Sequence, residues 1–255
     1  MRGFWTIFVK EFKGFFTSPG FYAVAGLFMV FSSFLFYNMF VQFAQMSLQM
    51  SFQGGGEGPN LHQQVIQGHI YNLNLILLFL VPFLTVRLLT EEKKARTMDL
   101  LLTSPVTSTQ IVLGKYFAAA AIVGVLLLVS MTFPVATAFF TKVQWGPLAS
   151  AYLGLFLVSA IYVAVGLFAS SLGDSVVVSG FVAIFLSLSL WFIAWSASTV
   201  DSAVVKDVLS HMSVSNHFGQ FIRGSIQTVG FAFMLSVIVL YCFLSQRVVE
   251  SARWR

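Results

Sequence analysis

Residues 148–170 read LASAYLGLFLVSAIYVAVGLFAS and contain no charged side chain. A helix needs about 20 mostly apolar residues to cross a hydrocarbon core of roughly 30 Å. The apolar residues run continuously here rather than in alternating ten-residue segments, which favours a helix over a strand of a transmembrane barrel. The stretch therefore predicts an α-helix that crosses a lipid bilayer.

Five further stretches meet the same requirement on either side of it. Together the predicted spans are residues 20–41, 70–89, 116–140, 148–170, 176–196 and 226–245. Of the 255 residues, 58% are hydrophobic and 9% are charged, whereas about a quarter of a soluble domain is charged. This balance excludes a disordered chain and argues against a water-soluble enzyme. We expect an all-α integral membrane protein whose six transmembrane helices form one domain over residues 19–255.

Lysine and arginine gather on one side of these spans. They lie in the amino end, in the connection between the second and third spans and in the tail, at Arg2, Lys10, Lys13, Arg87, Lys93, Lys94, Arg96, Lys115, Arg247, Arg253 and Arg255. The other side holds Lys142, Lys206 and Arg223. Because basic residues are retained in cytosolic loops, we expect both termini in the cytosol and the chain in the inner (cytoplasmic) membrane. The net charge of +5 is then explained by lysines and arginines of the cytosolic loops that lie against anionic lipid. Nucleic acid is not an expected partner.

Two long outer segments are predicted, at residues 42–69 and 197–225. The first holds a glycine-rich centre, and the length and apolar residues of the second predict short helices on or in the outer leaflet. The chain's histidines, His62, His69, His211 and His217, fall in these segments, and scattered histidines on wet loops predict no metal site. The polar residues near span ends, Gln42, Asn72 and Asn74, are expected to form hydrogen bonds between helices.

Residues 1–18 predict an amphipathic helix that lies in the membrane interface. Thr6, Lys10, Lys13 and Thr17 share one side, and an arc of roughly 120° on the other side holds Phe4, Trp5, Phe8, Phe12, Phe15 and Phe16. Such a helix contacts membrane lipids with its aromatic side. It is interpreted either as a simple anchor or as a lever that moves with a cytosolic partner.

The segment 90–106 is the most informative loop. The text RLLTEEKKARTMDLLLTSP, residues 87–105, joins a run of charges to a leucine triplet and a proline. A solvated charge run explains residues 91–96 but not the leucines. A short helix whose apolar side docks into a groove on another protein explains both. Thr107 and the residues after it predict the cap of the third span.

The same region resembles ABC-2 type permeases. The matching text is FLVP at 79–82, Arg87, EEKK at 91–94, TMDLLLTSP at 97–105 and GK at 114–115. It is most similar to the gliding-motility branch, whose typical text is (D/E)EKKxGTxELLLTxP, and Arg96 stands where that text has glycine. Residues 10–19 and 217–224 resemble the family's amino end and its segment before the last span, so the resemblance covers most of the chain.

The resemblance implies a type V exporter-like permease fold and a half-transporter that dimerises with a second copy or a homologous permease-like subunit. It also implies a cytosolic ABC ATPase partner, which binds ATP and Mg, and a coupling helix that docks on it. The coupling residues are Glu91, Glu92, Lys93, Lys94, Thr97, Asp99, Leu100, Leu101, Leu102, Thr103 and Pro105. No catalytic residue and no cofactor are predicted in this chain. A Walker motif ending at Gly114 and Lys115 would need glycine at Thr109 and serine or threonine at Tyr116.

Three functions stay open from the sequence. The first is ATP-driven export of a substrate, which is unknown because the spans lack a distinctive polar lining. The second is mechanical work on extracytoplasmic partner proteins. The third is an ATP-independent carrier or channel. A proton-coupled carrier usually places ionisable residues in mid-membrane, whereas Arg87 and Lys115 fall at predicted span ends, where they can snorkel to the interface.

Overall fold

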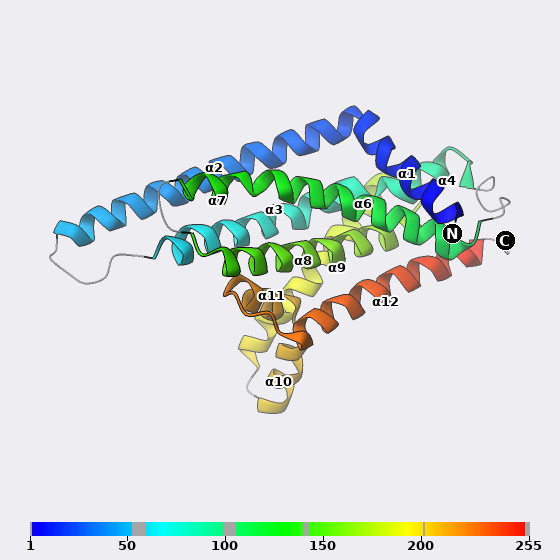
Figure 1. The fold of residues 1–255 in the computed structure, drawn as a ribbon. Helices are drawn as coiled ribbons and strands as arrows, with labels where there is room; N and C mark the ends of the chain where they lie inside the picture. Colours follow the sequence, from blue (N-terminus) through cyan, green and yellow to red (C-terminus); the bar gives the residue numbers. More distant parts are fainter. Residues whose placement is uncertain (1, 53–59, 99–105, 140–142, 201, 253–255) are drawn as a thin grey trace.

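The computed structural model describes residues 2–52, 60–98, 106–139, 143–200 and 202–252, and within these ranges all regular structure is helical. Figure 1 shows the arrangement. The helices are α1 (Arg2–Thr17), α2 (Pro19–Phe52), the π-helix η1 (His62–Gln67), α3 (Gly68–Thr85), α4 (Arg87–Lys94), α6 (Ser108–Ser130), α7 (Thr132–Thr137), α8 (Trp145–Leu172), α9 (Val176–Thr199), α10 (Ala203–His211), α11 (Val214–Ile222) and α12 (Thr228–Ala252).

The predicted six-span, all-α fold is confirmed. Helical segments long and apolar enough to cross a membrane cover residues 19–50, 62–94, 108–137, 145–172, 176–193 and 228–252. Both chain ends lie at the same end of the bundle (Figure 1), which we call the termini end, and the opposite end is called the far end. The helix α1 runs obliquely to the bundle at the termini end.

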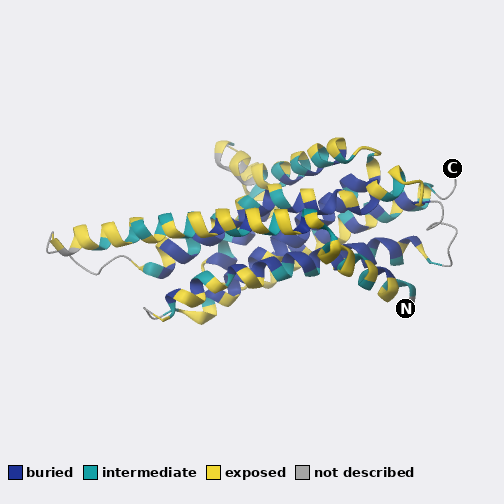
Figure 2. Cartoon of the chain, turned by 90° about the horizontal axis from the view of Figure 1, so that it is seen from above, coloured by how far each residue is buried: buried dark blue, intermediate teal, exposed yellow. Residues whose placement is uncertain are grey.

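The helix α8 forms the centre of the bundle. In its most apolar window 83% of the residues are buried, against 11% in α2, so α8 is the core helix and α2 is peripheral. It packs against α3, α6, α9, α11 and α12, and Figure 2 shows the buried residues concentrated along the middle of the bundle. Its Tyr162 hydroxyl donates to Asn74 Oδ1 over 3.1 Å, which confirms the predicted interhelical hydrogen bond of Asn74.

Several helices extend beyond the predicted spans. The third span begins at Ser108 rather than at residue 116, because Thr107 and Gln110 form the predicted cap as a reciprocal capping box. The helix of the first span, α2, continues to Phe52, through residues predicted as an outer segment. Those residues, 42–52, contain glutamine, methionine and leucine, which are good helix formers, and neither glycine nor proline.

The segment 197–225 contains the predicted short helices. The helix α11 packs beside the far half of α8, where the Ser150 hydroxyl donates to the Phe221 carbonyl over 2.9 Å. The chain leaves α11 through Gly224, whose φ of 87° favours glycine. The helix α10 has no buried residue and projects from the bundle (Figure 1).

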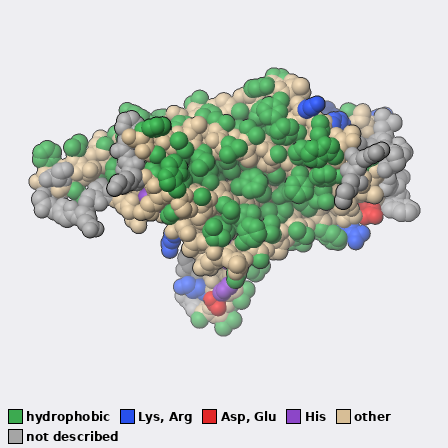
Figure 3. All heavy atoms as spheres, in the orientation of Figure 1, with side chains coloured by type: hydrophobic (Ala, Val, Ile, Leu, Met, Phe, Trp, Pro, Cys, Tyr) green, Lys and Arg blue, Asp and Glu red, His purple; other side chains and the backbone are tan. Residues whose placement is uncertain are grey.

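The surface of the bundle suits a lipid environment. Figure 3 shows apolar side chains over the middle of one face, with charged side chains toward the termini end and on α10. Exposed tryptophans lie toward both ends, with Trp5 at the termini end and Trp145 and Trp195 toward the far end. Tryptophan is enriched at membrane–water interfaces, so these residues are consistent with a bilayer around the bundle.

Candidate functional site

The joint between α3 and α4 lies against α8. Val86 is the single residue between the two helices. The Ser170 hydroxyl of α8 donates to the Val86 carbonyl over 2.7 Å and accepts from the backbone N–H groups of Leu89 and Thr90 over 2.9 and 3.1 Å. The first N–H groups of a helix have no partner within it, and here a neighbouring helix supplies one. The Thr90 hydroxyl also donates to the Val86 carbonyl.

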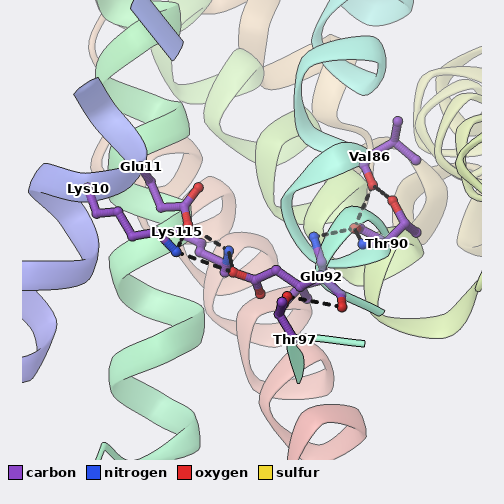
Figure 4. Close-up of polar contacts among 9 residues, drawn as sticks. Lys10, Glu11, Val86, Thr90, Glu92, Thr97 and Lys115 are labelled. Carbon is purple, nitrogen blue, oxygen red and sulfur yellow. Dashed lines mark hydrogen bonds and ion pairs between the residues drawn. The ribbon is translucent and has the colours of Figure 1, made fainter. Parts of the chain in front are cut away.

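A buried lysine connects α4 to α6 and α1. The Lys115 side chain, on α6, is 1% exposed, and its Nζ lies 2.8 Å from both Glu11 Oε1 on α1 and Glu92 Oε1 on α4. Lys10 Nζ lies at the edge of the same group, 4.0 Å from Glu11 Oε1 and 3.9 Å from Glu92 Oε1. Figure 4 shows these side chains converging from three helices. We call Lys10, Glu11, Glu92 and Lys115 the Lys115 cluster.

Small residues allow α1 to approach α6 closely enough for these ion pairs. A Cβ added at Gly114 would lie 2.8 Å from Ile7 Cγ2, and one added at Gly3 would lie 2.9 Å from Gln110 Oε1. Ile7 is buried, and Glu11 lies one turn further along α1. The close contact therefore directs Glu11 toward Lys115.

A second side of α4 is attached to the end of α8. Lys93 Nζ donates to the Ser171 carbonyl over 2.6 Å and to the Gly173 carbonyl over 3.5 Å, and it lies 3.6 Å from Asp174 Oδ1. The last carbonyls of a helix carry partial negative charge and attract a cation. Lys93 therefore ties α4 to the end of α8 and to the turn that leads into α9.

The remaining predicted coupling residues divide into three groups. Glu91 is exposed and lies 3.6 Å from Arg87, and Lys94 is exposed. The Thr97 hydroxyl donates to the Glu92 carbonyl over 3.3 Å. The others lie outside the described residues: Asp99, Leu100, Leu101, Leu102, Thr103 and Pro105.

The prediction that Lys115 snorkels to the interface is wrong. Its ammonium group is enclosed by α1, α4 and α6, and two carboxylates compensate the charge that burial would otherwise make costly. Glu92 likewise points into the protein, with 16% of its side chain exposed. Glu11, Lys115 and Ser170 were not predicted as functional residues.

The helix α4 ends in a Schellman motif. The Thr97 N–H donates to the Glu92 carbonyl over 3.0 Å, and the Arg96 N–H donates to the Lys93 carbonyl over 3.1 Å. Arg96 has a φ of 54°, the only positive value outside glycine among the described residues. The Schellman motif favours glycine at this position. Glycine is also the residue that stands here in the typical text of the permeases that the sequence resembles.

The aromatic residues of α1 form a row along the helix. Ring centroids are 5.2 Å apart for Trp5 and Phe8, 5.8 Å for Phe8 and Phe12, and 5.2 Å for Phe12 and Phe16. Trp5 and Phe16 are exposed, and Phe4, Phe8, Phe12 and Phe15 are half-buried. Because Ile7 faces α6, this row is left at the side of the contact, where lipid can reach it.

The prediction that the histidines lie on wet loops is wrong for three of the four. His62, His69 and His217 are buried, and only His211 is exposed. His69 belongs to α3 and lies between the rings of Phe36 and Phe133, at centroid distances of 5.0 and 5.7 Å. The imidazole packs edge-on against both rings, with interplanar angles of 78° and 74°. The described residues contain no group of three or more His, Cys, Asp or Glu that could hold a metal ion.

Six membrane-spanning helical segments define a multi-pass α-helical membrane protein. The family described as ABC-2 family transporter protein matches residues 5–249. The chain belongs to this family, and it is an ABC transporter permease subunit rather than the ATPase itself. No curated protein matches the chain.

Proposed function

We propose that this permease subunit transmits the motion of a separate cytosolic ABC ATPase to its membrane spans through α4. The observation that carries the proposal is the attachment of α4 on two sides. Glu92 binds Lys115 on α6, which also binds Glu11 on α1, while Lys93 and the Ser170 hydroxyl connect α4 to α8. A displacement of α4 therefore acts on both groups of helices, as expected for a rigid-body transition.

The orientation of the chain is part of the proposal. With the termini in the cytosol of an inner-membrane protein, α1 and α4 lie on the side where an ATPase binds. The distribution of lysine and arginine supports this orientation, and so does the position of both helices at the termini end (Figure 1). ATP and Mg²⁺ would bind to the ATPase, and the permease would dimerise with a second copy or a homologous subunit.

Membership of a transporter family favours export of a substrate as the output. The resemblance to the gliding-motility branch supports a second output, in which the same motion acts on extracytoplasmic proteins and no solute crosses. Flux into liposomes together with substrate-stimulated ATP hydrolysis distinguishes the two. Activity of this chain without any ATPase would instead identify an ATP-independent carrier or channel.

Adjacent lysines on α4 provide a matched test of the transmission route. Lys93 is tied to α8, with 21% of its side chain exposed, and Lys94 is exposed. Spin labels toward the far end, on Met50→Cys in α2 and Val204→Cys in α10, where both native side chains are exposed, report the distance between these helices in the complex with the ATPase. We expect ATP and Mg²⁺ to change this distance in the spin-labelled protein with native lysines and equally in Lys94→Gln. In Lys93→Gln the change in distance should be less than half of that value.

Both lysine variants should retain the ATPase on purification, so that a lost response reflects coupling rather than docking. An equal distance change in Lys93→Gln and Lys94→Gln would show that the route through α8 is wrong. Failure of any ATPase to co-purify with the unmodified permease would contradict the proposed function.

A further inference from the structure

The helix α2 is too long to be covered by hydrocarbon alone. It has 34 residues, which at 1.5 Å per residue is about 51 Å, against a hydrocarbon core of roughly 30 Å. It projects beyond the rest of the bundle at the far end (Figure 1). Its whole length contains no charged residue, although a helix standing in water normally presents a charged face.

One face of α2 packs against the bundle. Phe28 and Ser32 are fully buried, and Phe36 contacts His69 of α3. Further along, Met39 Sδ accepts from the Asn72 side chain over 3.3 Å, and Met46 Sδ accepts from the Gln64 side chain over 3.0 Å. These contacts assign one side of the helix to α3 and η1 as far as Met46.

The opposite face carries a continuous apolar stripe with coiled-coil spacing. The stripe alternates steps of three and four residues over three heptads, at Leu27, Val30, Phe34, Tyr37, Val41, Ala44 and Leu48. Among its large side chains Val41 is half-buried. The others are exposed, with exposed fractions of 56% for Leu27, 66% for Val30, 62% for Phe34, 66% for Tyr37 and 59% for Leu48. A stripe of this period is typical of the seam between two helices.

The part of the stripe that projects beyond the bundle would be stabilised by contact with another protein surface. Lipid chains cover about 20 residues of a helix, which from Pro19 leaves the last part of α2 outside the hydrocarbon. The stripe continues there without a change of phase, through Ala44 and Leu48, and Phe52 beside it is 88% exposed. Apolar side chains in water are stabilised by burial against another protein surface.

We propose that the stripe is the contact between two copies of this chain, formed by parallel pairing of their α2 helices. Two copies inserted in one membrane have α2 pointing the same way, so a heptad stripe meets itself in register about a two-fold axis. Because α2 carries no charge, no like-charge repulsion opposes this pairing. The inference rests on the proposed dimer and names its surface, and its test requires no ATP.

Single cysteines test the pairing. The native Cys242 is buried on α12 and remains in place. Ala44→Cys and Leu48→Cys lie on the stripe, and Met46→Cys and Met50→Cys are matched controls in the same part of α2, where the native residues are 41% and 39% exposed. After mild oxidation of membranes we expect at least tenfold more disulfide-linked dimer, at twice the mass of the chain, from the stripe positions than from the controls.

Each alternative result overturns the pairing. Equal cross-linking at Met46→Cys and Met50→Cys would indicate random collision. No dimer from Leu48→Cys, while a maleimide still labels it, would show that the stripe does not face a second copy. A cross-linked product of any other mass would identify a different partner. Loss of ATPase co-purification with the cross-link intact would contradict the proposed function and leave this inference standing.

Discussion

Arg96 occupies a backbone conformation that suits glycine better. A left-handed conformation costs a residue with a Cβ roughly 1–2 kcal/mol, and the φ of Arg96 is 54°. Part of the gain from glycine is offset by the greater freedom of the unfolded chain. We therefore expect Arg96→Gly to stabilise the purified protein by about 1 kcal/mol or less, measured by thermal unfolding in detergent. Arg96→Ala is the control, because alanine keeps the Cβ, and equal stability of both variants would contradict the interpretation.

The Lys115 cluster predicts a charge-specific loss of stability. Lys115→Met leaves Glu11 and Glu92 close together without the ammonium group between them, and breaking a buried pair in this way costs about 3–5 kcal/mol. Adding Glu11→Gln and Glu92→Gln removes the stranded charges and should recover at least half of the loss. Denaturant unfolding of the single and triple variants measures both effects. A triple variant no more stable than Lys115→Met would show that packing, not charge, holds the cluster.

From the sequence, Glu92 was predicted as a functional residue, but its contacts with Lys115 and Glu11 were not predicted. The motif placed Glu92 in the coupling segment, whereas Lys115 lies 23 residues away and the separation between Glu11 and Lys115 is 104 residues. Composition alone does not reveal which side of a span meets lipid, so an ionisable residue at a helix end was assigned to the interface. The one available signal was Glu11, the only acidic residue before Glu57.

At the scale of elements, the leucines after α4 are predicted to dock the ATPase. They lie outside the described residues. Leu101→Asp places a charge in an apolar groove, so we expect ATPase association to weaken by several kcal/mol. Lys94→Ala, at the rim, should cost about 1 kcal/mol or less. Co-purification of the ATPase with tagged, membrane-inserted permease measures both.

The orientation of the three leucines requires a series. Leu100→Asp and Leu102→Asp are therefore made alongside Leu101→Asp, and at least one of them is expected to release the ATPase. Retention of the ATPase by all three variants would show that another segment docks it.

Helix existence was easier to predict than helix ends. Each span was predicted from a continuous apolar run, and all six are present. The observed helices are longer than the predicted spans where polar residues next to the apolar run are also helical. Thr107 and Gln110 cap α6 before its apolar run begins. The uncharged glutamines after Val41 allow α2 to continue to Phe52. The π-helix η1 has no comparable signal, because its sequence HQQVIQ does not distinguish it from an α-helix.

For the whole molecule, the two-sided attachment of α4 connects this helix to α1 and α6 on one side and to α8 on the other. The core helix α8 accepts a hydrogen bond from Lys93 at one end and packs against α11 near the other end. Movement of α4 along this route would reach the far end through a helix that is buried for most of its length. Buried helices shift as rigid units because packed interiors deform little, which makes α8 the expected carrier of the motion.

The orientation of the molecule is the last prediction, and it follows from the unequal distribution of basic residues. With both termini in the cytosol, an impermeant maleimide added to intact cells should label Gly56→Cys and Ser202→Cys, which belong to the two predicted outer segments. It should not label Ala95→Cys at the end of α4 until the cells are permeabilised. The buried Cys242 keeps the background low. Labelling of Ala95→Cys in intact cells, with Gly56→Cys unlabelled, would reverse the orientation and place α4 where no cytosolic ATPase could reach it.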